Sequence, residues 1–332
     1  MKKRVWVSSV VLFALVVALA TSAQAATWKL SHVRPQDTTI DKELNWFANA
    51  AKEASGGKIQ IKTYPANALG DYTLVQERVG MGSVDMACQP PTSNADKRFQ
   101  LAYFPYLVAS WDQAKKNYSK GAPLRGTAEE LYGKQGIRVL AAWPVYFGGI
   151  ALNKEAKSPG DPNVAKGLKV RVPPMKSFQL LADSTGYIGT PLPFSEAFTA
   201  VQTGVVDGVI GSGAEGYYSS FRDVTKYYIP INTHFEMWYL IMNEDLYKKL
   251  DANQKQALED VANRFEQRRW EAGPADQTAN EKKLADAGAK IVAVSPQEIA
   301  ATAQKARAAV WPKILDDVGK EWGEKIIKAI VQ

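Results

Sequence analysis

Residues 58–64, Lys-Ile-Gln-Ile-Lys-Thr-Tyr, alternate polar and apolar side chains, which is typical of a strand with one buried face. Apolar residues recur at helical spacing over 41–55, just before this strand. A second helix over about 71–79 and a strand over 84–88 follow it, and 28–32 forms a short strand near the start. Strands and helices that alternate in this order build βαβ units, so the sequence predicts an α/β fold.

The second half of the chain repeats this arrangement. Residues 167–172 predict a strand and 177–185 a helix, and Pro193 opens a further helix that the Ser195 side chain can cap. From Glu244 onward the pattern is almost entirely helical. Two similar α/β halves predict two lobes, and ligand sites usually lie in the cleft between such lobes.

The bulk properties are those of an exported globular protein. The chain has 332 residues, of which 46% are hydrophobic and 23% charged. A basic start, an apolar run over 7–20 and a small-residue cleavage site at 23–25 form the pattern of a secretory signal peptide. The run of about 14 residues is short for a membrane span of roughly 20. We expect residues 1–25 to be removed and the mature protein to be periplasmic.

Several classes of function find little support. The only cysteine, Cys88, can form neither an internal disulfide nor a lipid anchor next to the signal peptide. The formal charge is +7, and removing the three basic residues of the signal peptide leaves about +4. Basic and acidic residues alternate without a basic block, so no nucleic-acid partner is expected. The only histidines, His32 and His234, lack the spacing of a zinc site, and we expect no metal or cofactor.

Residues 211–216, Gly-Ser-Gly-Ala-Glu-Gly, have the spelling of a dinucleotide-binding turn and follow a short apolar strand. Their context argues against that function. They lie deep in the chain, and 217–222 does not predict a clear amphipathic helix. Glu236 has the spacing of the ribose-binding acid, but it lies in an aromatic run with no intact βαβ unit before it. We therefore interpret the glycines as a loop where missing side chains make room for a ligand, with an exported oxidoreductase as a remote alternative.

Arg171 lies inside the strand 167–172, and its two valine neighbours point to the opposite face. If both faces are covered, the guanidinium needs a carboxylate or phosphate partner, and its fork suits a carboxylate. Pairing with a nearby Asp or Glu, or a strand end in water, are the alternatives. Aromatic residues cluster near other strand ends, where they belong either to the core or to cleft walls. These are Trp143, Tyr146, Phe147, Tyr217, Tyr218, Phe235, Trp238 and Tyr239.

Three motifs occur together: Gly-Leu-Lys-Val-Arg-Val-Pro at 167–173, Pro-Leu-Pro-Phe-Ser-Glu at 191–196 and Val-Gln-Thr-Gly-Val-Val-Asp-Gly at 201–208. On these motifs, nearly all of the mature chain resembles the periplasmic solute receptors of tripartite ATP-independent periplasmic (TRAP) transporters, of the dicarboxylate-receptor type. The resemblance implies a two-lobed periplasmic binding protein fold with mixed sheets, a long connecting helix and a helical C-terminus. It also implies a monomeric receptor that closes over a small organic acid and delivers it to a membrane permease.

The resemblance also implies a division into lobes and a set of ligand-binding residues. Lobe I is expected to comprise 26–147 and about 234–275, and lobe II 148–233 and about 276–332. In that family the strand arginine, here Arg171, binds the ligand carboxylate. The other candidate ligand-binding residues are Phe194, Phe147, Trp143, Tyr146, Gly211, Ser212, Glu215, Trp238, Tyr72, Ser93 and His32.

The departures from the family pattern narrow the range of ligands that we expect. Many sialate-type members carry a second arginine where our alignment places Gly148, so a second cationic clamp is expected to be missing. Side-chain bulk is also absent at Gly211. We therefore hypothesise a monocarboxylate with a bulky or aromatic body, and the alternative is a small C4-dicarboxylate or keto acid. A signalling receptor that does not transport its ligand is a third possibility.

Overall fold

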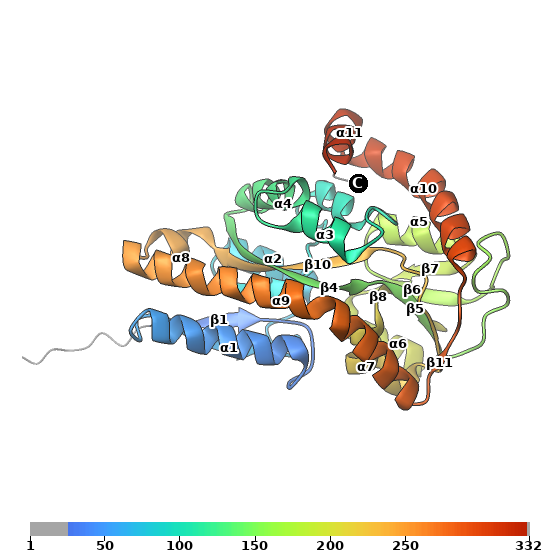
Figure 1. The fold of residues 1–332 in the computed structure, drawn as a ribbon, viewed down its shortest axis with the longest axis horizontal. Coiled ribbons are helices and arrows are strands. Elements are labelled where there is room, and N and C mark those ends of the chain that lie inside the picture. The colour runs from blue at the N-terminus through green and yellow to red at the C-terminus, as the bar shows by residue number, and fades with distance from the viewer. Residues whose placement is uncertain (1–25, 331–332) are drawn as a thin grey trace, which may run out of the picture.

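The computed structural model describes residues 26–330, which form two mixed sheets surrounded by helices (Figure 1). The predicted signal peptide, residues 1–25, lies outside the described residues. The strands are β1 (Thr27–Ser31), β2 (Gln60–Tyr64), β3 (Met86–Gln89), β4 (Ile137–Phe147), β5 (Gly149–Leu152), β6 (Lys169–Val172), β7 (Ile188–Pro191), β8 (Gly208–Ser212), β9 (Tyr227–Ile229), β10 (Phe235–Asn243) and β11 (Lys290–Ile291). The helices are α1 (Thr39–Ala54), α2 (Tyr72–Gly80), α3 (Trp111–Tyr118), α4 (Pro123–Gly133), α5 (Lys176–Ser184), α6 (Phe194–Gln202), α7 (Ala214–Phe221), α8 (Glu244–Lys248), α9 (Ala252–Asp286), α10 (Pro296–Val318) and α11 (Lys320–Ala329), with the 3-10 helices η1 (Lys97–Tyr103) and η2 (Arg222–Val224).

The first sheet has the strand order β2-β1-β3-β10-β4. Strand β1 pairs in parallel with β2 and β3, whereas β10 runs antiparallel to β3 and β4. The helices predicted over 41–55 and about 71–79 are α1 and α2, and each starts and ends within two residues of the predicted bounds. The Asp71 side chain fixes the start of α2, because it accepts a hydrogen bond from the Thr73 backbone N–H at 3.1 Å.

The second sheet has the order β11-β9-β5-β8-β6-β7, in which β6 runs parallel to β7 and β8. All three central residues of the β6 motif, Val170, Arg171 and Val172, are buried, so both faces of this strand are covered. The predicted cap of α6 is wrong. Pro193 occupies the cap position, and the Ser195 backbone N–H instead donates to Asp71 at 3.0 Å.

The chain passes between the two sheets three times. It crosses at Gly148 between β4 and β5, returns over 230–234 between β9 and β10, and crosses again along the 35-residue helix α9. Helix α9 contacts β4 and α1 near one end and α7 and β11 near the other (Figure 1). These crossings create two lobes, each built on one sheet, with a cleft between them.

The two C-terminal helices do not lie on one lobe. Helix α10 packs against α5 of the second lobe and against η1 of the first. Helix α11 packs on α4, and Trp322 lies under Arg98 at 5.6 Å, so this helix covers the first lobe (Figure 1). We expected the whole 276–332 segment to belong to lobe II. In the structure, α11 packs its apolar side against first-lobe helices instead. Among helices of the described part of the chain, none combines the length and apolar character needed to cross a membrane.

Candidate functional site

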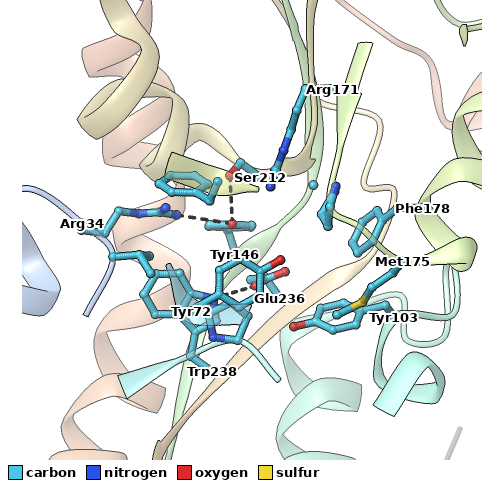
Figure 2. A pocket seen from close by; sticks show the side chains of 15 residues that line it. Arg34, Tyr72, Tyr103, Tyr146, Arg171, Met175, Phe178, Ser212, Glu236 and Trp238 are labelled. Atoms are coloured by element: carbon cyan, nitrogen blue, oxygen red, sulfur yellow. Dashed lines mark hydrogen bonds between the residues drawn. The ribbon is translucent and has the colours of Figure 1, made fainter. Parts of the chain in front are cut away.

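A cavity lies where the two sheets meet, beside the carboxyl ends of β1, β3, β6 and β8, the usual position of ligand sites in α/β proteins. The space between its lining atoms is about 370 Å³, part of which is open to solvent. Both lobes contribute to its walls (Figure 2). The lining residues are Val33, Arg34, Tyr72, Pro90, Tyr103, Tyr146, Arg171, Pro173, Met175, Phe178, Phe194, Gly211, Ser212, Glu236 and Trp238.

Arg171 reaches this cavity from β6, and its side chain is 1% exposed. Its Nε donates to the Leu192 carbonyl oxygen at 2.8 Å, and its guanidinium lies 5.7 Å from the centre of the Phe194 ring. The Nη2 atom is buried and has no hydrogen-bond partner among the described residues. Burial lowers the pKa of the guanidinium, although the neighbouring Tyr72 and Asp71 act to raise it. Arg171 is therefore a buried cation with unused donor capacity.

Arg34, which follows β1, is a second buried arginine at the cavity. Its Nη2 lies 2.9 Å from Oε2 of Glu215 in α7, and its Nε lies 3.0 Å from the same oxygen. Burial acts to lower the pKa of Arg34, but the charge and hydrogen bonds of Glu215, together with Tyr146, outweigh it, and the pKa is raised. The guanidinium also lies 4.8 Å from the Trp238 ring and 5.0 Å from the Phe194 ring. This arginine is fully engaged within the protein and ties the first lobe to the second.

Glu236 is a buried carboxylate in the cavity wall. Its Oε1 accepts from Trp238 Nε1 at 2.6 Å, and its Oε2 lies 2.9 Å from His234 Nε2. Between the charged groups, the Tyr146 hydroxyl lies 3.4 Å from Ser212 Oγ (Figure 2). Burial raises the pKa of the Tyr146 phenol, which keeps it neutral. Among residues 26–330, the cavity thus combines a cation without a carboxylate partner, Arg171, with the carboxylate of Glu236, neutral hydroxyl groups and aromatic walls.

Seven of the predicted site residues line the cavity: Arg171, Phe194, Tyr146, Gly211, Ser212, Trp238 and Tyr72. Glu215 lies just behind the wall as the partner of Arg34. Their role in ligand binding stays a prediction.

The remaining four predicted residues lie outside this cavity. Trp143 stacks on Phe265 at 4.8 Å in the first-lobe core. Phe147 packs edge-on to Phe235 at 5.0 Å, on the other side of the same strand pair. His32 Nε2 lies 3.0 Å from Asp41 Oδ1, and Ser93 is half-buried in the loop after β3. No three His, Cys, Asp or Glu side chains within residues 26–330 are grouped as a metal site would require.

The interpretation of the glycines needs correction. A Cβ atom at Gly148 would lie 2.3 Å from His234, and one at Gly211 would lie 2.5 Å from Pro173. Within the 211–216 loop, a Cβ at Gly213 would lie 2.6 Å from Tyr146, and one at Gly216 would lie 2.6 Å from Arg34. The missing side chains therefore make room for other residues of the protein, including cavity-lining ones, rather than for a ligand directly.

The segment after these glycines also differs from expectation. Residues Ala214–Phe221 form the helix α7, which the sequence pattern did not predict. Its amphipathic pattern is weak because packing against α9 and a buried Tyr217 covers most of its surface. The Tyr217 hydroxyl lies 2.8 Å from the carbonyl oxygens of both Gly149 and Val209 and shares its one hydrogen between them, which anchors the helix to the sheet.

Two charged cavity residues, Arg34 and Glu236, were not among the predicted site residues. Each had a signal in the sequence. Arg34 follows the strand β1, and charged residues at the carboxyl ends of strands often belong to sites. Glu236 is the only charged residue in the apolar strand β10. A second arginine, Arg34, does line the cavity, but it is paired with Glu215, so the expected lack of a second cationic clamp stays a prediction.

Comparisons with known proteins agree with this architecture. The family described as bacterial extracellular solute-binding protein, family 7 (DctP), matches residues 30–316. A solute-binding protein of Albidiferax ferrireducens is 27% identical over 301 residues, which cover 87% of this chain and 87% of that protein. The C4-dicarboxylate-binding periplasmic protein DctP of Rhodobacter capsulatus is 26% identical over 320 residues, which cover 94% of this chain and 91% of that protein.

A solved structure has the same fold. An extracytoplasmic solute receptor of Bordetella pertussis that binds pyroglutamic acid superposes with a TM-score of 0.82 at 24% identity, covering 92% of this chain and 99% of that one. The family match spans most of the chain, and members of this periplasmic family are substrate-binding receptors that work with membrane permeases. The oxidoreductase alternative for residues 211–216 is therefore wrong. The chain belongs to the bacterial extracellular solute-binding protein family 7 and is a TRAP solute receptor of the DctP type, not an enzyme.

Proposed function

We propose that this receptor binds the carboxylate of a small organic acid at Arg171, between its lobes, and delivers the acid to a permease after export as a monomer. The observation that supports the proposal is the Nη2 atom of Arg171, which is buried at the cavity without a hydrogen-bond partner among the described residues. An unsatisfied buried donor on a charged group is costly. A ligand carboxylate supplies the missing acceptor and the opposite charge, and it suits the geometry of the guanidinium fork.

The charges around the cavity favour a single carboxylate. Arg34 is already paired with Glu215, so it has no charge left to neutralise a second one. Glu236 would repel a second carboxylate, because like charges in a desolvated site are strongly unfavourable. This arrangement supports a monocarboxylate over a C4-dicarboxylate. Compact keto acids carry the same single carboxylate and belong in the same test.

The size of the cavity favours a compact body. The space between its lining atoms is about 370 Å³, part of it open to solvent, so a bulky ligand would require the lobes to separate further. The Phe194 and Trp238 rings offer flat apolar walls on which a small ring can pack. We therefore propose a ring-sized monocarboxylate, which refines the expectation of a bulky or aromatic body.

Binding is coupled to closure of the lobes. The Arg34–Glu215 ion pair and the hydrogen bond from Ser195 to Asp71 both join the first lobe to the second. When the lobes separate, these contacts break and the cavity opens. A ligand held by Arg171 of the second lobe and by walls of the first lobe favours the closed form, as in other hinge-closing receptors.

Isothermal titration calorimetry with the mature protein tests the carboxylate anchor. The ligands are pyroglutamate, succinate, a short keto acid and indoleacetate, together with whatever compound mass spectrometry finds in the denatured purified protein. We expect Arg171→Gln to weaken binding of the best ligand more than tenfold, roughly 1.4 kcal/mol. The matched control is Arg222→Gln, because Arg222 is an arginine on the second-lobe surface. A smaller effect of Arg171→Gln, or an equal effect of the control, contradicts the proposal.

A further inference from the structure

A simple organic acid held at Arg171 does not explain why the cavity also contains the carboxylate of Glu236. It is 3% exposed and belongs to the cavity wall, yet it is the only charged residue of β10. Figure 2 shows it beside Trp238, apart from Arg171. A buried carboxylate is costly unless hydrogen bonds or opposite charge stabilise it, so its presence here needs an explanation.

The protein uses only part of the hydrogen-bonding capacity of Glu236. Trp238 Nε1 donates to one oxygen, and His234 Nε2 lies within hydrogen-bond distance of the other. An ionised carboxylate offers about four acceptor positions, so these two contacts leave acceptor capacity at the cavity. Its charge acts across the cavity: after burial, Glu236 is the next largest factor that raises the pKa of the Tyr103 and Tyr146 phenols.

We propose that Glu236 accepts a hydrogen bond from an N–H group of the ligand, so that the substrate class is a compact ring acid that carries both a carboxylate and an N–H donor. This inference rests on the proposed function, because it places the ligand carboxylate at Arg171. The ligand then complements the cavity at both charges, as electrostatic complementarity requires for specificity. A ligand without a donor at this position would leave the remaining acceptor positions of Glu236 desolvated and unused.

The surroundings of Glu236 favour a single donor over a polyhydroxylated body. The neighbouring walls include the Trp238 indole, the rings of Tyr103 and Phe178, and Met175. Hydroxyl groups on several carbons would each need a polar partner, and the cavity offers few besides the hydroxyls of Tyr72, Tyr146 and Ser212. An N–H on an otherwise apolar ring needs one acceptor, which Glu236 provides.

Matched ligand pairs test the inference by calorimetry. The first pair is pyroglutamate and the lactone acid in which the ring oxygen replaces the N–H. The second is proline and cyclopentanecarboxylate, with α-hydroxycyclopentanecarboxylate as the hydroxyl analogue. In at least one pair we expect the N–H member to bind tenfold or more tightly than its partner, and the hydroxyl analogue, whose O–H donates from outside the ring, to bind less tightly than the N–H member. Binding that is equal within each pair, or tightest for the hydroxyl analogue, overturns the inference.

A variant assigns the effect to Glu236. We expect Glu236→Gln to reduce the ratio within the responding pair to less than about threefold. The matched control is Glu266→Gln, which changes another buried carboxylate of the same lobe, bound to Arg125 and away from the cavity. The control should alter thermal stability and leave the ratio unchanged. A ratio that survives in Glu236→Gln overturns the assignment, and circular dichroism shows whether each variant is folded.

The failure of this inference is distinct from failure of the proposed function. Suppose that Arg171→Gln abolishes binding while the two members of each ligand pair bind the wild type equally. This result supports Arg171 as the carboxylate anchor and contradicts only the proposed N–H contact to Glu236. If none of the five compounds binds, the molecular formula of the compound released from the protein decides the question. A released acid without nitrogen overturns the inference, and one with an N–H group supports it.

Discussion

Arg34 and Arg171 make an instructive comparison, because both are 1% exposed, both line the same cavity and both contact the Phe194 ring. Arg34 is bound to both oxygens of Glu215, whereas Arg171 donates to one carbonyl oxygen, interacts with the neutral Tyr72 hydroxyl and keeps a buried Nη2 without a partner among the described residues. The same side chain therefore has two uses in one cleft. A protein carboxylate completes the first, and we propose that a ligand completes the second.

The pKa values of the two arginines move in opposite directions for a physical reason. Burial acts to lower both, because a desolvated cation is unfavourable. At Arg34 the charge and hydrogen bonds of Glu215, together with Tyr146, reverse this effect, while Tyr72 and Asp71 offset it only partly at Arg171. If Arg171 holds the ligand carboxylate as we propose, the ligand should therefore stabilise the folded protein.

We expect the largest change in stability when the Arg34–Glu215 ion pair is broken. Arg34→Met leaves Glu215 as a buried, unpaired carboxylate, so we expect the free energy of unfolding to fall by about 3–5 kcal/mol. Urea denaturation measures this change. The double variant Arg34→Met/Glu215→Leu should recover most of the loss, because no charge is then left unpaired. A single variant as stable as the wild type would show that the pair does not hold the lobes together.

The second prediction concerns the same substitution at the other arginine. Arg171→Met removes a buried charge that lacks a protein counterion, so the ligand-free free energy of unfolding should change by less than about 1 kcal/mol, or rise. The same denaturation experiment, on protein refolded after removal of bound ligand, gives the value. A loss as large as that expected for Arg34→Met would mean that Arg171 has a structural partner and is not reserved for a ligand.

The stability of the first lobe should depend on pH through His32, which lies near Arg34. Burial lowers the pKa of His32, with a smaller contribution from the charge of Arg34, although Asp41 opposes both. The folded state then binds fewer protons than the unfolded state just below pH 6.5. The contribution of His32 to stability is therefore complete above that pH and lost as the pH falls through it, with a slope of at most about 1.4 kcal/mol per pH unit. His32→Gln should flatten this part of the curve in urea titrations between about pH 5 and 8. An unchanged slope in the variant would assign the effect elsewhere.

The smallest expected effect lies at the second contact between the lobes. Ser195 donates to Asp71 through its backbone N–H, and no side-chain cap is present on α6. Ser195→Ala should therefore change the free energy of unfolding by less than about 0.5 kcal/mol, as surface substitutions usually do. Asp71→Ala serves as the comparison and should cost about 1–2 kcal/mol through loss of the α2 cap. Equal losses for the two variants would indicate that the Ser195 hydroxyl acts after all.

Local patterns predicted the elements well. The alternation in 58–64 and the helical spacing in 41–55 reflect which side chains each element buries, and this depends on neighbours only a few positions away. The same reasoning failed at α7, where the helix is buried on several sides and its periodicity is weak. It also misassigned α11, since the choice between two lobes depends on surfaces that other segments present.

By itself, the sequence determined the α/β class, the positions of most strands and helices, and Arg171 as a charged residue in a buried strand. These follow from hydrophobic periodicity and from the cost of burying a cation. Only the tertiary structure decided which arginine has a counterion, because Arg34 and Glu215 are 181 positions apart and meet through closure of two lobes. It likewise decided that Glu236 lines the cavity and that Trp143 and Phe147 do not, since packing of one lobe on the other selects which side chains face the cleft.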